Sequence, residues 1–250
     1  MENIGKVLYL SKIFSIILLV VAIAGTLDFK GFFGAKEAWG GKLCDVKIKY
    51  CAEQKCRVSF DGLESGVLNA YAFFEKLGYA GKYDVDIEII PEVFIVSGDG
   101  EKRTKIRVIG KYEEGEKTIY LTCWREKWLL ERRDFHIDMT NEFYKTVVTH
   151  EMIHFLANRY AKKKLDVLLS EYIAYSGQLE FLPHKTIAAL AEHYKLQAIE
   201  IKDLNEMAFM LAPGTFGLKS YLHYKQTNGV LVKEIIAGSF KSQDYTSFPF

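Results

Sequence analysis

The sequence predicts an α+β fold in which a small antiparallel sheet comes first and a helical subdomain follows. Two observations lead to this class. Between residues 85 and 123, apolar residues alternate with polar ones or gather in β-branched runs, which is typical of strands. From residue 141 almost to the C-terminus, apolar residues recur at helical spacing instead. A chain of 250 residues fits one main domain with a small appendage.

A helix is expected before the strands. Apolar residues recur at helical spacing between Gly62 and Leu77, and Gly78 supplies a stop. Strands are predicted at 85–89, 93–96, 106–109 and 118–123. The last two flank a glycine-containing turn at 113–116, so we expect them to pair as a hairpin.

The helical region begins at Asn141, where Thr140 and Asn141 can cap the first turn, and its first helix is expected to end near Lys164. Pro183 separates the next two helices. The remaining helices are predicted at 170–181, 185–194, 204–211, 218–227 and 230–237.

The N-terminus differs in kind from the rest of the chain. Lysines precede an apolar run at Ile13–Ala24, whose last residues fit a cleavage site, so we expect residues 1–24 to be a signal peptide. The alternative is an uncleaved membrane anchor, because the apolar stretch counted from Val7 reaches about twenty residues. We therefore expect the protein to be exported to the periplasm or the extracellular space. Residues 25–61 are then a cysteine-containing loop or linker, and 62–250 the main domain.

The cysteines form an even set in a chain predicted to leave the cytoplasm, so disulfides become possible. They are Cys44, Cys51, Cys56 and Cys123. Three pairings are open, and the close spacing of the first three suggests one local bridge and a second bridge to Cys123. The formal net charge of +1 removes the excess of cations that a nucleic-acid-binding protein needs.

One motif carries chemistry, the H-E-x-x-H pattern of His150, Glu151 and His154. Histidines four residues apart lie on one face of a helix, so both imidazoles can reach a single tetrahedral zinc ion. Glu151 can take a proton from an activated water and deliver it to the leaving amine. The alternative is a chance pair of core histidines, but a charged glutamate on a mostly buried helix needs a partner, and a metal site supplies one.

From Thr118 to Tyr175 the chain resembles the gluzincins, zinc metallopeptidases of the thermolysin-like and aminopeptidase-like group of zincins. In that group a glutamate on the next helix completes the metal site, and Glu171 in Glu-Tyr-Ile-Ala matches its pattern. Asp166 and Glu180 are competing candidates. The resemblance implies a zincin-like fold, Zn²⁺ held by His150, His154 and Glu171, and a peptide or protein substrate.

The resemblance also implies an edge strand that binds the substrate backbone, and Lys117–Trp124 occupies that place, with a purely structural hairpin as the alternative. A tyrosine or histidine outside the metal shell often stabilises the oxyanion. Candidates for that role are Tyr175, Tyr221, His223 and Tyr224, and Asn158 is a candidate for orienting a ligand.

The sequence therefore predicts a zinc-dependent peptidase with Glu151 as general base. The alternative is a non-catalytic zinc-binding envelope protein that acts as a scaffold or binds a partner, attached to the membrane if the N-terminal segment is retained.

Overall fold

The computed structural model describes residues 46–50, 61–81, 83–97, 104–123, 126–131, 133–196 and 199–240. The predicted signal peptide or anchor and most of the predicted linker lie outside these residues. Within the described ranges, no helix combines the length and the apolar character needed to cross a membrane. Cys123 forms a disulfide, as predicted, and the other three cysteines lie outside the described ranges.

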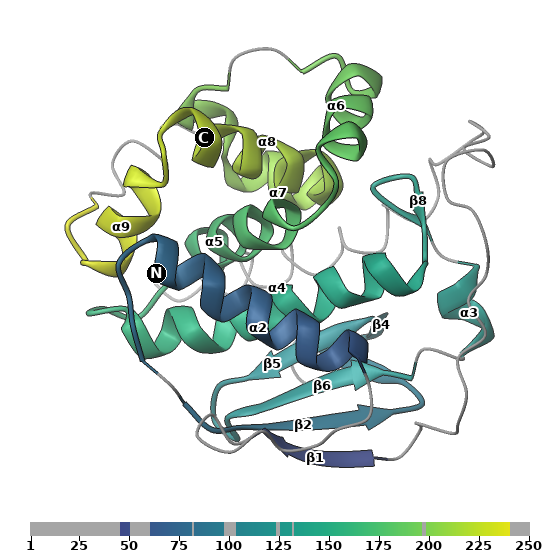
Figure 1. Cartoon of the computed structure of the whole chain (residues 1–250). Coiled ribbons are helices and arrows are strands. Elements are labelled where there is room, and N and C mark those ends of the chain that lie inside the picture. Colours follow the sequence, from purple (N-terminus) through teal and green to yellow (C-terminus); the bar gives the residue numbers. More distant parts are fainter. Residues whose placement is uncertain are drawn as a thin grey trace, which may run out of the picture.

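The architecture is α+β, as predicted, with most strands preceding the main helices (Figure 1). The main sheet has the strand order β1-β2-β6-β5. These strands are β1 (Val46–Tyr50), β2 (Val85–Ile90), β5 (Gly110–Glu113) and β6 (Thr118–Thr122). The backbone of β1 lies within the stretch 25–61, which the sequence predicted as a loop or linker, and pairs antiparallel with β2.

The main sheet is mixed, so the prediction of a purely antiparallel sheet is wrong. Strands β2 and β6 pair in parallel, whereas the other two pairings are antiparallel. Parallel neighbours need a crossover connection, and the chain between them supplies one through a second, two-stranded sheet. That sheet consists of β3 (Val93–Ser97) and β4 (Thr104–Val108).

The predicted hairpin of 106–109 with 118–123 is also partly wrong. Strand β4 pairs with β3, and the partner of β6 in its hairpin is β5. The chain changes sheets at Ile109, whose carbonyl accepts a hydrogen bond of 2.7 Å from the amide of Thr122. The apolar residues that predicted a strand end at Ile109, and the Gly-Lys-Tyr-Glu segment after it lacks a strand pattern, so β5 was not predicted.

Helices α2 (Asp61–Lys76) and α4 (Asn141–Tyr160) pack against each other and lie across the main sheet (Figure 1). The predicted apolar face of α2 is buried, and Gly78 follows it with a φ of +90°. Thr140 caps α4 by accepting from the Phe143 amide, as predicted. Helix α4 ends four residues before the predicted end. The backbone is extended at Ala161, and the amide of Lys162 donates to the carbonyl of Ile236, the last residue of α9, instead of continuing the helix.

Two further helices complete the core. Helix α5 (Val167–Glu180) packs on α4, and α8 (Pro213–Gln226) packs on α5. Helix α5 begins three residues before the predicted start, because Asp166 caps it by accepting from the Leu169 amide. Helix α8 begins five residues early, with Pro213 in its first turn, where proline is tolerated. Buried side chains of the sheet and these helices form one continuous cluster.

The remaining elements are short. They are α3 (Lys127–Leu130), β7 (Arg133–Asp134), β8 (Ile137–Asp138), α6 (His184–His193), η1 (Ile201–Asp203), α7 (Glu206–Leu211) and α9 (Val230–Ile236). Strands β7 and β8 form a two-residue hairpin that the sequence did not predict. The helix expected at 204–211 is α7, which begins two residues after the predicted start because Asn205 caps it by accepting from the Ala208 amide, and the short η1 precedes it.

Candidate metal centre

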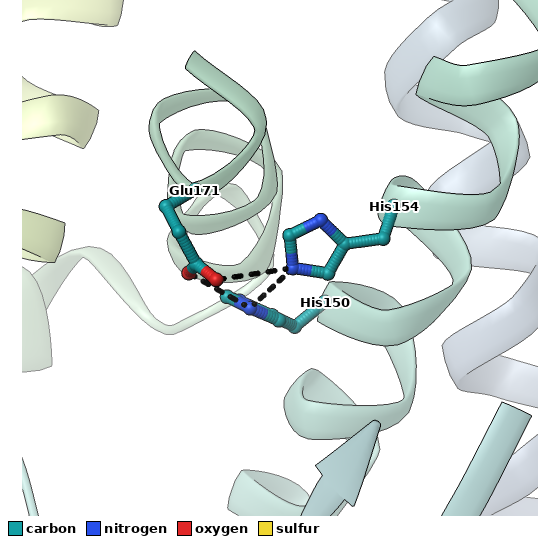
Figure 2. Close-up of side chains that lie close together, drawn as sticks. All are labelled: His150, His154 and Glu171. Atoms are coloured by element: carbon teal, nitrogen blue, oxygen red, sulfur yellow. Dashed lines mark hydrogen bonds and ion pairs between the residues drawn. The ribbon is translucent and has the colours of Figure 1, made fainter. Parts of the chain in front are cut away.

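The two histidines of the motif lie on one face of α4, and Glu171 of α5 faces them (Figure 2). The Nε2 atoms of His150 and His154 are 3.0 Å apart. The two carboxylate oxygens of Glu171 lie 3.4 Å from Nε2 of His150 and 3.6 Å from Nε2 of His154. The structure therefore brings together the three residues that the sequence predicted as metal ligands.

The spacing of these atoms matches the geometry of a tetrahedral metal site. Nitrogen and oxygen ligands about 2.0–2.1 Å from zinc, at tetrahedral angles, lie about 3.3 Å from one another. All three measured separations fall within a few tenths of an ångström of that value. The side chains are also largely shielded from water, since those of His150 and His154 are 11% and 13% exposed. The cluster could therefore hold a metal ion.

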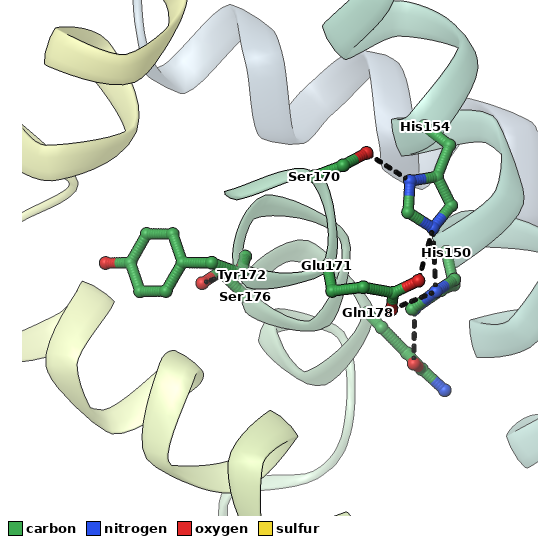
Figure 3. A network of polar contacts seen from close by, with 7 residues as sticks. All are labelled: His150, His154, Ser170, Glu171, Tyr172, Ser176 and Gln178. Carbon is green, nitrogen blue, oxygen red and sulfur yellow. Dashed lines mark hydrogen bonds and ion pairs between the residues drawn. The ribbon is translucent and has the colours of Figure 1, made fainter. Parts of the chain in front are cut away.

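Two side chains of α5 hold the imidazoles in place (Figure 3). The Nδ1 atom of His150 lies 2.9 Å from Oε1 of Gln178, and Nδ1 of His154 lies 2.8 Å from Oγ of Ser170. An amide oxygen can only accept, so Nδ1 of His150 donates and its Nε2 lone pair points at the centre. The amide nitrogen of Gln178 donates to Thr146, which fixes the orientation of the amide.

Neither Gln178 nor Ser170 was predicted from the sequence. A usable signal existed for Gln178, because it follows Glu171 by seven residues and so lies on the same face of α5. Ser170 precedes Glu171 directly and carries no comparable signal.

The electrostatics of the centre suit a cation. Burial lowers the pKa of His154 to about 4, so its imidazole is neutral at neutral pH. Burial by itself would raise the pKa of the Glu171 carboxyl, but a hydrogen bond from His150, made when that imidazole is protonated, and the charges of both histidines lower it. Burial by itself would lower the pKa of His150, and its contact with the same carboxylate raises it. An ionised carboxylate beside a neutral imidazole supplies the deprotonated ligands that a metal ion requires.

Glu151 lies next to this centre and against strand β5. A Cβ atom placed on Gly110 would come within 2.7 Å of Cγ of Glu151, so only glycine permits this approach. Burial raises the pKa of Glu151 to about 7, and the nearby His150 and a hydrogen bond from the backbone N–H of Tyr112 oppose that rise. A carboxylate with a pKa near neutrality is suited to accept and return a proton.

The centre opens into a cleft of about 870 Å³. The three clustered side chains and Glu151 line it, together with β5, the β7–β8 turn, and the connection between α7 and α8. Strand β5 is the edge of the sheet at this cleft. The predicted edge strand, Lys117–Trp124, contains β6, which pairs with β2 on one side and β5 on the other, so the prediction is wrong. Both sides of β6 are already used in ladders.

The competing candidates for the third ligand lie elsewhere. Asp166 caps α5 and lines the cleft, but it is not part of the cluster. Glu180 forms ion pairs with Lys76 at 3.3 Å and Lys225 at 3.1 Å at the opposite end of α5.

Of the four candidates for oxyanion stabilisation, Tyr175 lines the cleft, and its ring centroid is 4.7 Å from that of His150. Tyr221, His223 and Tyr224 do not line it. His223 instead lies 2.9 Å from the hydroxyl of Tyr172 in the core. Asn158 lines the cleft, but the contacts that orient the histidines come from α5.

Residues 65–244 match the model of a family described as a family of unknown function, DUF6639. The match covers 180 of the 250 residues and includes every residue of the candidate metal centre. No curated protein and no solved structure matches the chain.

Proposed function

Because the chain belongs to the DUF6639 family, whose function is unknown, we propose a function from the site itself: a zinc-dependent peptidase of the gluzincin type. One observation carries this proposal. Two histidines and a glutamate converge at ligand distances beside a cleft, and a second glutamate of raised pKa lies next to them.

The number of ligands favours catalysis over a structural role. Structural zinc sites are closed by four protein side chains, whereas catalytic sites have three and leave one position for water or substrate. Within the described residues, the cluster contains three such side chains, and all three line the cleft. This arrangement supports an enzyme rather than the alternative of a zinc-binding scaffold.

In the proposed reaction, bound zinc supplies Lewis acidity that activates water and polarises the scissile carbonyl. Glu151 accepts the proton of the attacking water and passes it to the nitrogen of the leaving amine. The backbone N–H of Tyr112 and the close approach of Gly110 hold the carboxylate of Glu151 at the cleft wall. Gln178 and Ser170 keep the two imidazoles oriented while the charge changes.

Among the described strands, β5 is an edge of the main sheet, and we expect an extended peptide to pair with it. The Ile109 carbonyl bonds to Thr122 of β6, so the alternation of an antiparallel ladder turns the backbone groups of Gly110 and Tyr112 outward. The bond from the Tyr112 amide to Glu151 agrees with this direction. A peptide added along β5 would therefore pass beside the general base and the metal centre.

Export is part of the same proposal. The disulfide at Cys123 supports it, because disulfides persist in oxidising compartments such as the periplasm or the extracellular space. The proposed substrates are peptides or proteins of that compartment, and attachment to the membrane would depend on whether the N-terminal segment is cleaved.

The test compares zinc content and peptide hydrolysis of the wild type and a Glu151→Gln variant. The variant is expected to bind zinc in the same molar ratio, measured by plasma mass spectrometry, and to lose hydrolysis by at least about a hundredfold. Equal hydrolysis by both proteins would refute the role of Glu151. Zinc binding without hydrolysis by the wild type would favour the scaffold alternative.

A further inference from the structure

The cleft has two halves that differ in charge, one on each side of Glu151. Strand β5 and helix α4 run in the same direction along the cleft. Gly110 at the start of β5 contacts Glu151, and the Tyr112 ring further along β5 lies 5.8 Å from the ring of Phe155, which is one turn further along α4. One half therefore lies beside the first turns of α4 and the start of β5. The other half lies beyond His154 and the end of β5.

Among the described residues that line the cleft, the charged side chains outside the metal centre belong to the second half or to β5 itself. They are Lys111, Glu114, Lys164 and Asp166. Leu165 and Val167 also line that half, so it is mixed. The first half, which we call the apolar half, is lined chiefly by carbon: Ile95, Val108, Phe135, Val147, Phe209 and Leu211. Apart from Lys111 of β5, whose ammonium group forms an ion pair with Glu113, it therefore offers a binding surface without a described Lys, Arg, Asp or Glu outside the metal centre.

A strained turn fixes one wall of the apolar half. Phe135 and His136, the two residues that connect β7 and β8, have φ values of 54° and 59°, a strained region that non-glycine residues rarely adopt. The conformation buries Phe135 between Phe143 and Tyr175, at ring distances of 6.2 and 5.9 Å, and leaves His136 lining the cleft. Since Tyr175 packs on His150, this wall is tied directly to the metal centre.

A second wall of the apolar half, formed by α7, leaves apolar surface open to solvent. Leu211, the last residue of α7, is 52% exposed although it lines the cleft. A large apolar side chain bound there would cover this surface, whereas a charged side chain would lose hydration without gaining a partner.

We propose that the apolar half is a specificity subsite for a large apolar residue, such as leucine or phenylalanine, next to the scissile bond of a peptide substrate. This inference rests on the proposed function for its substrate class. It identifies Leu211 and Phe209 of α7 and the β7–β8 turn as the elements that determine specificity.

The test uses dodecapeptides that differ only in one central residue, which is Phe, Leu, Asp or Lys. We expect the zinc-loaded wild type to cleave next to Phe and Leu with a kcat/KM at least about tenfold above that for Asp and Lys. Leu211→Lys should remove most of this preference. Met207→Lys is the matched control, because Met207 lies on the same helix, is 50% exposed, and does not line the cleft.

A binding assay separates this proposal from the proposed function. Fluorescein-labelled forms of the same peptides are titrated with zinc-loaded Glu151→Gln protein, and anisotropy gives Kd without hydrolysis. The subsite is supported if the protein binds the Phe peptide preferentially and if this preference is weakened by Leu211→Lys but not by Met207→Lys. This result would support the subsite even if the wild type hydrolyses nothing. Hydrolysis or binding with no preference for apolar residues, or no binding of any peptide, would overturn the subsite.

Discussion

Replacing Gln178 with alanine removes the acceptor that orients His150. Its Oε1 lies 2.9 Å from Nδ1 of His150, and the glutamine is only 3% exposed, so this hydrogen bond is shielded from bulk water. An unpaired buried donor costs about 1–3 kcal/mol. At about 1.4 kcal/mol for each factor of ten, this corresponds to a loss of zinc affinity of about 5- to 150-fold. The usual effect of removing such an outer-shell partner, about 10- to 100-fold, lies within this range.

The assay is competition for zinc against a chromophoric chelator at fixed pH, which yields the Kd of each variant. Ser176→Ala is the matched control, because Ser176 is fully buried on the same helix but its hydroxyl bonds to the Tyr172 carbonyl, on the side of α5 turned away from the centre (Figure 3). Gln178→Glu keeps an acceptor and should bind zinc at least as tightly as the wild type. If Gln178→Ala and Ser176→Ala have Kd values within twofold of each other, Gln178 does not support a metal ligand.

Three further outcomes are expected. Glu171→Ala should reduce bound zinc to well below one ion per chain by plasma mass spectrometry, because it removes one of three ligands, and undiminished zinc would exclude Glu171 as a ligand. Gly110→Ala should lower kcat/KM by about ten- to a hundredfold with zinc content unchanged, because the new Cβ atom would displace Glu151. Unchanged kinetics would show that the carboxylate of Glu151 does not need this close contact with β5. Burial lowers the pKa of His223 below its unfolded value of about 6.5, so its contribution to stability is present above that pH and is lost as the pH falls. Urea unfolding with EDTA should therefore show a steeper loss of stability from pH 7 to pH 5 for the wild type than for His223→Gln, and equal slopes would contradict this.

The parts of the fold that depend on local pattern were predicted well. The buried face of α2, the alternation of β2 and the cap of α4 at Thr140 each depend on residues within a few positions of one another. The strand pairing could not be predicted in the same way. The parallel ladder of β2 with β6, and the change of sheets at Ile109, depend on contacts between distant segments, and the β-branched pattern is the same for either arrangement.

The residues of the candidate site also differ in whether local spacing or distant contacts determine their position. His150, Glu151 and His154 lie within one helical turn, so their spacing alone fixes which of them can share a metal ion. Strand β5 at the cleft was missed because the identity of an edge strand depends on the order of strands in space, which the sequence does not contain. Tyr221, His223 and Tyr224 were candidates because of their chemistry, yet their helix turns them away from the cleft.

The third ligand depends on how closely α5 approaches α4, and Gly177 lies where the two helices are in close contact. A Cβ atom on Gly177 would lie 2.0 Å from Cδ1 of Ile153 and 3.1 Å from Cγ of Phe73, so a larger residue would require the Ile153 side chain to move within a packed core or the two helices to separate. Ile153 lies directly before His154, and Gly177 lies six residues after Glu171 on α5. The measured distances of 3.4 and 3.6 Å from the Glu171 carboxylate to the imidazoles leave little room for such a shift. The ligand set is therefore a property of the packing between two helices as much as of the motif, and the absence of a side chain at Gly177 contributes to that packing.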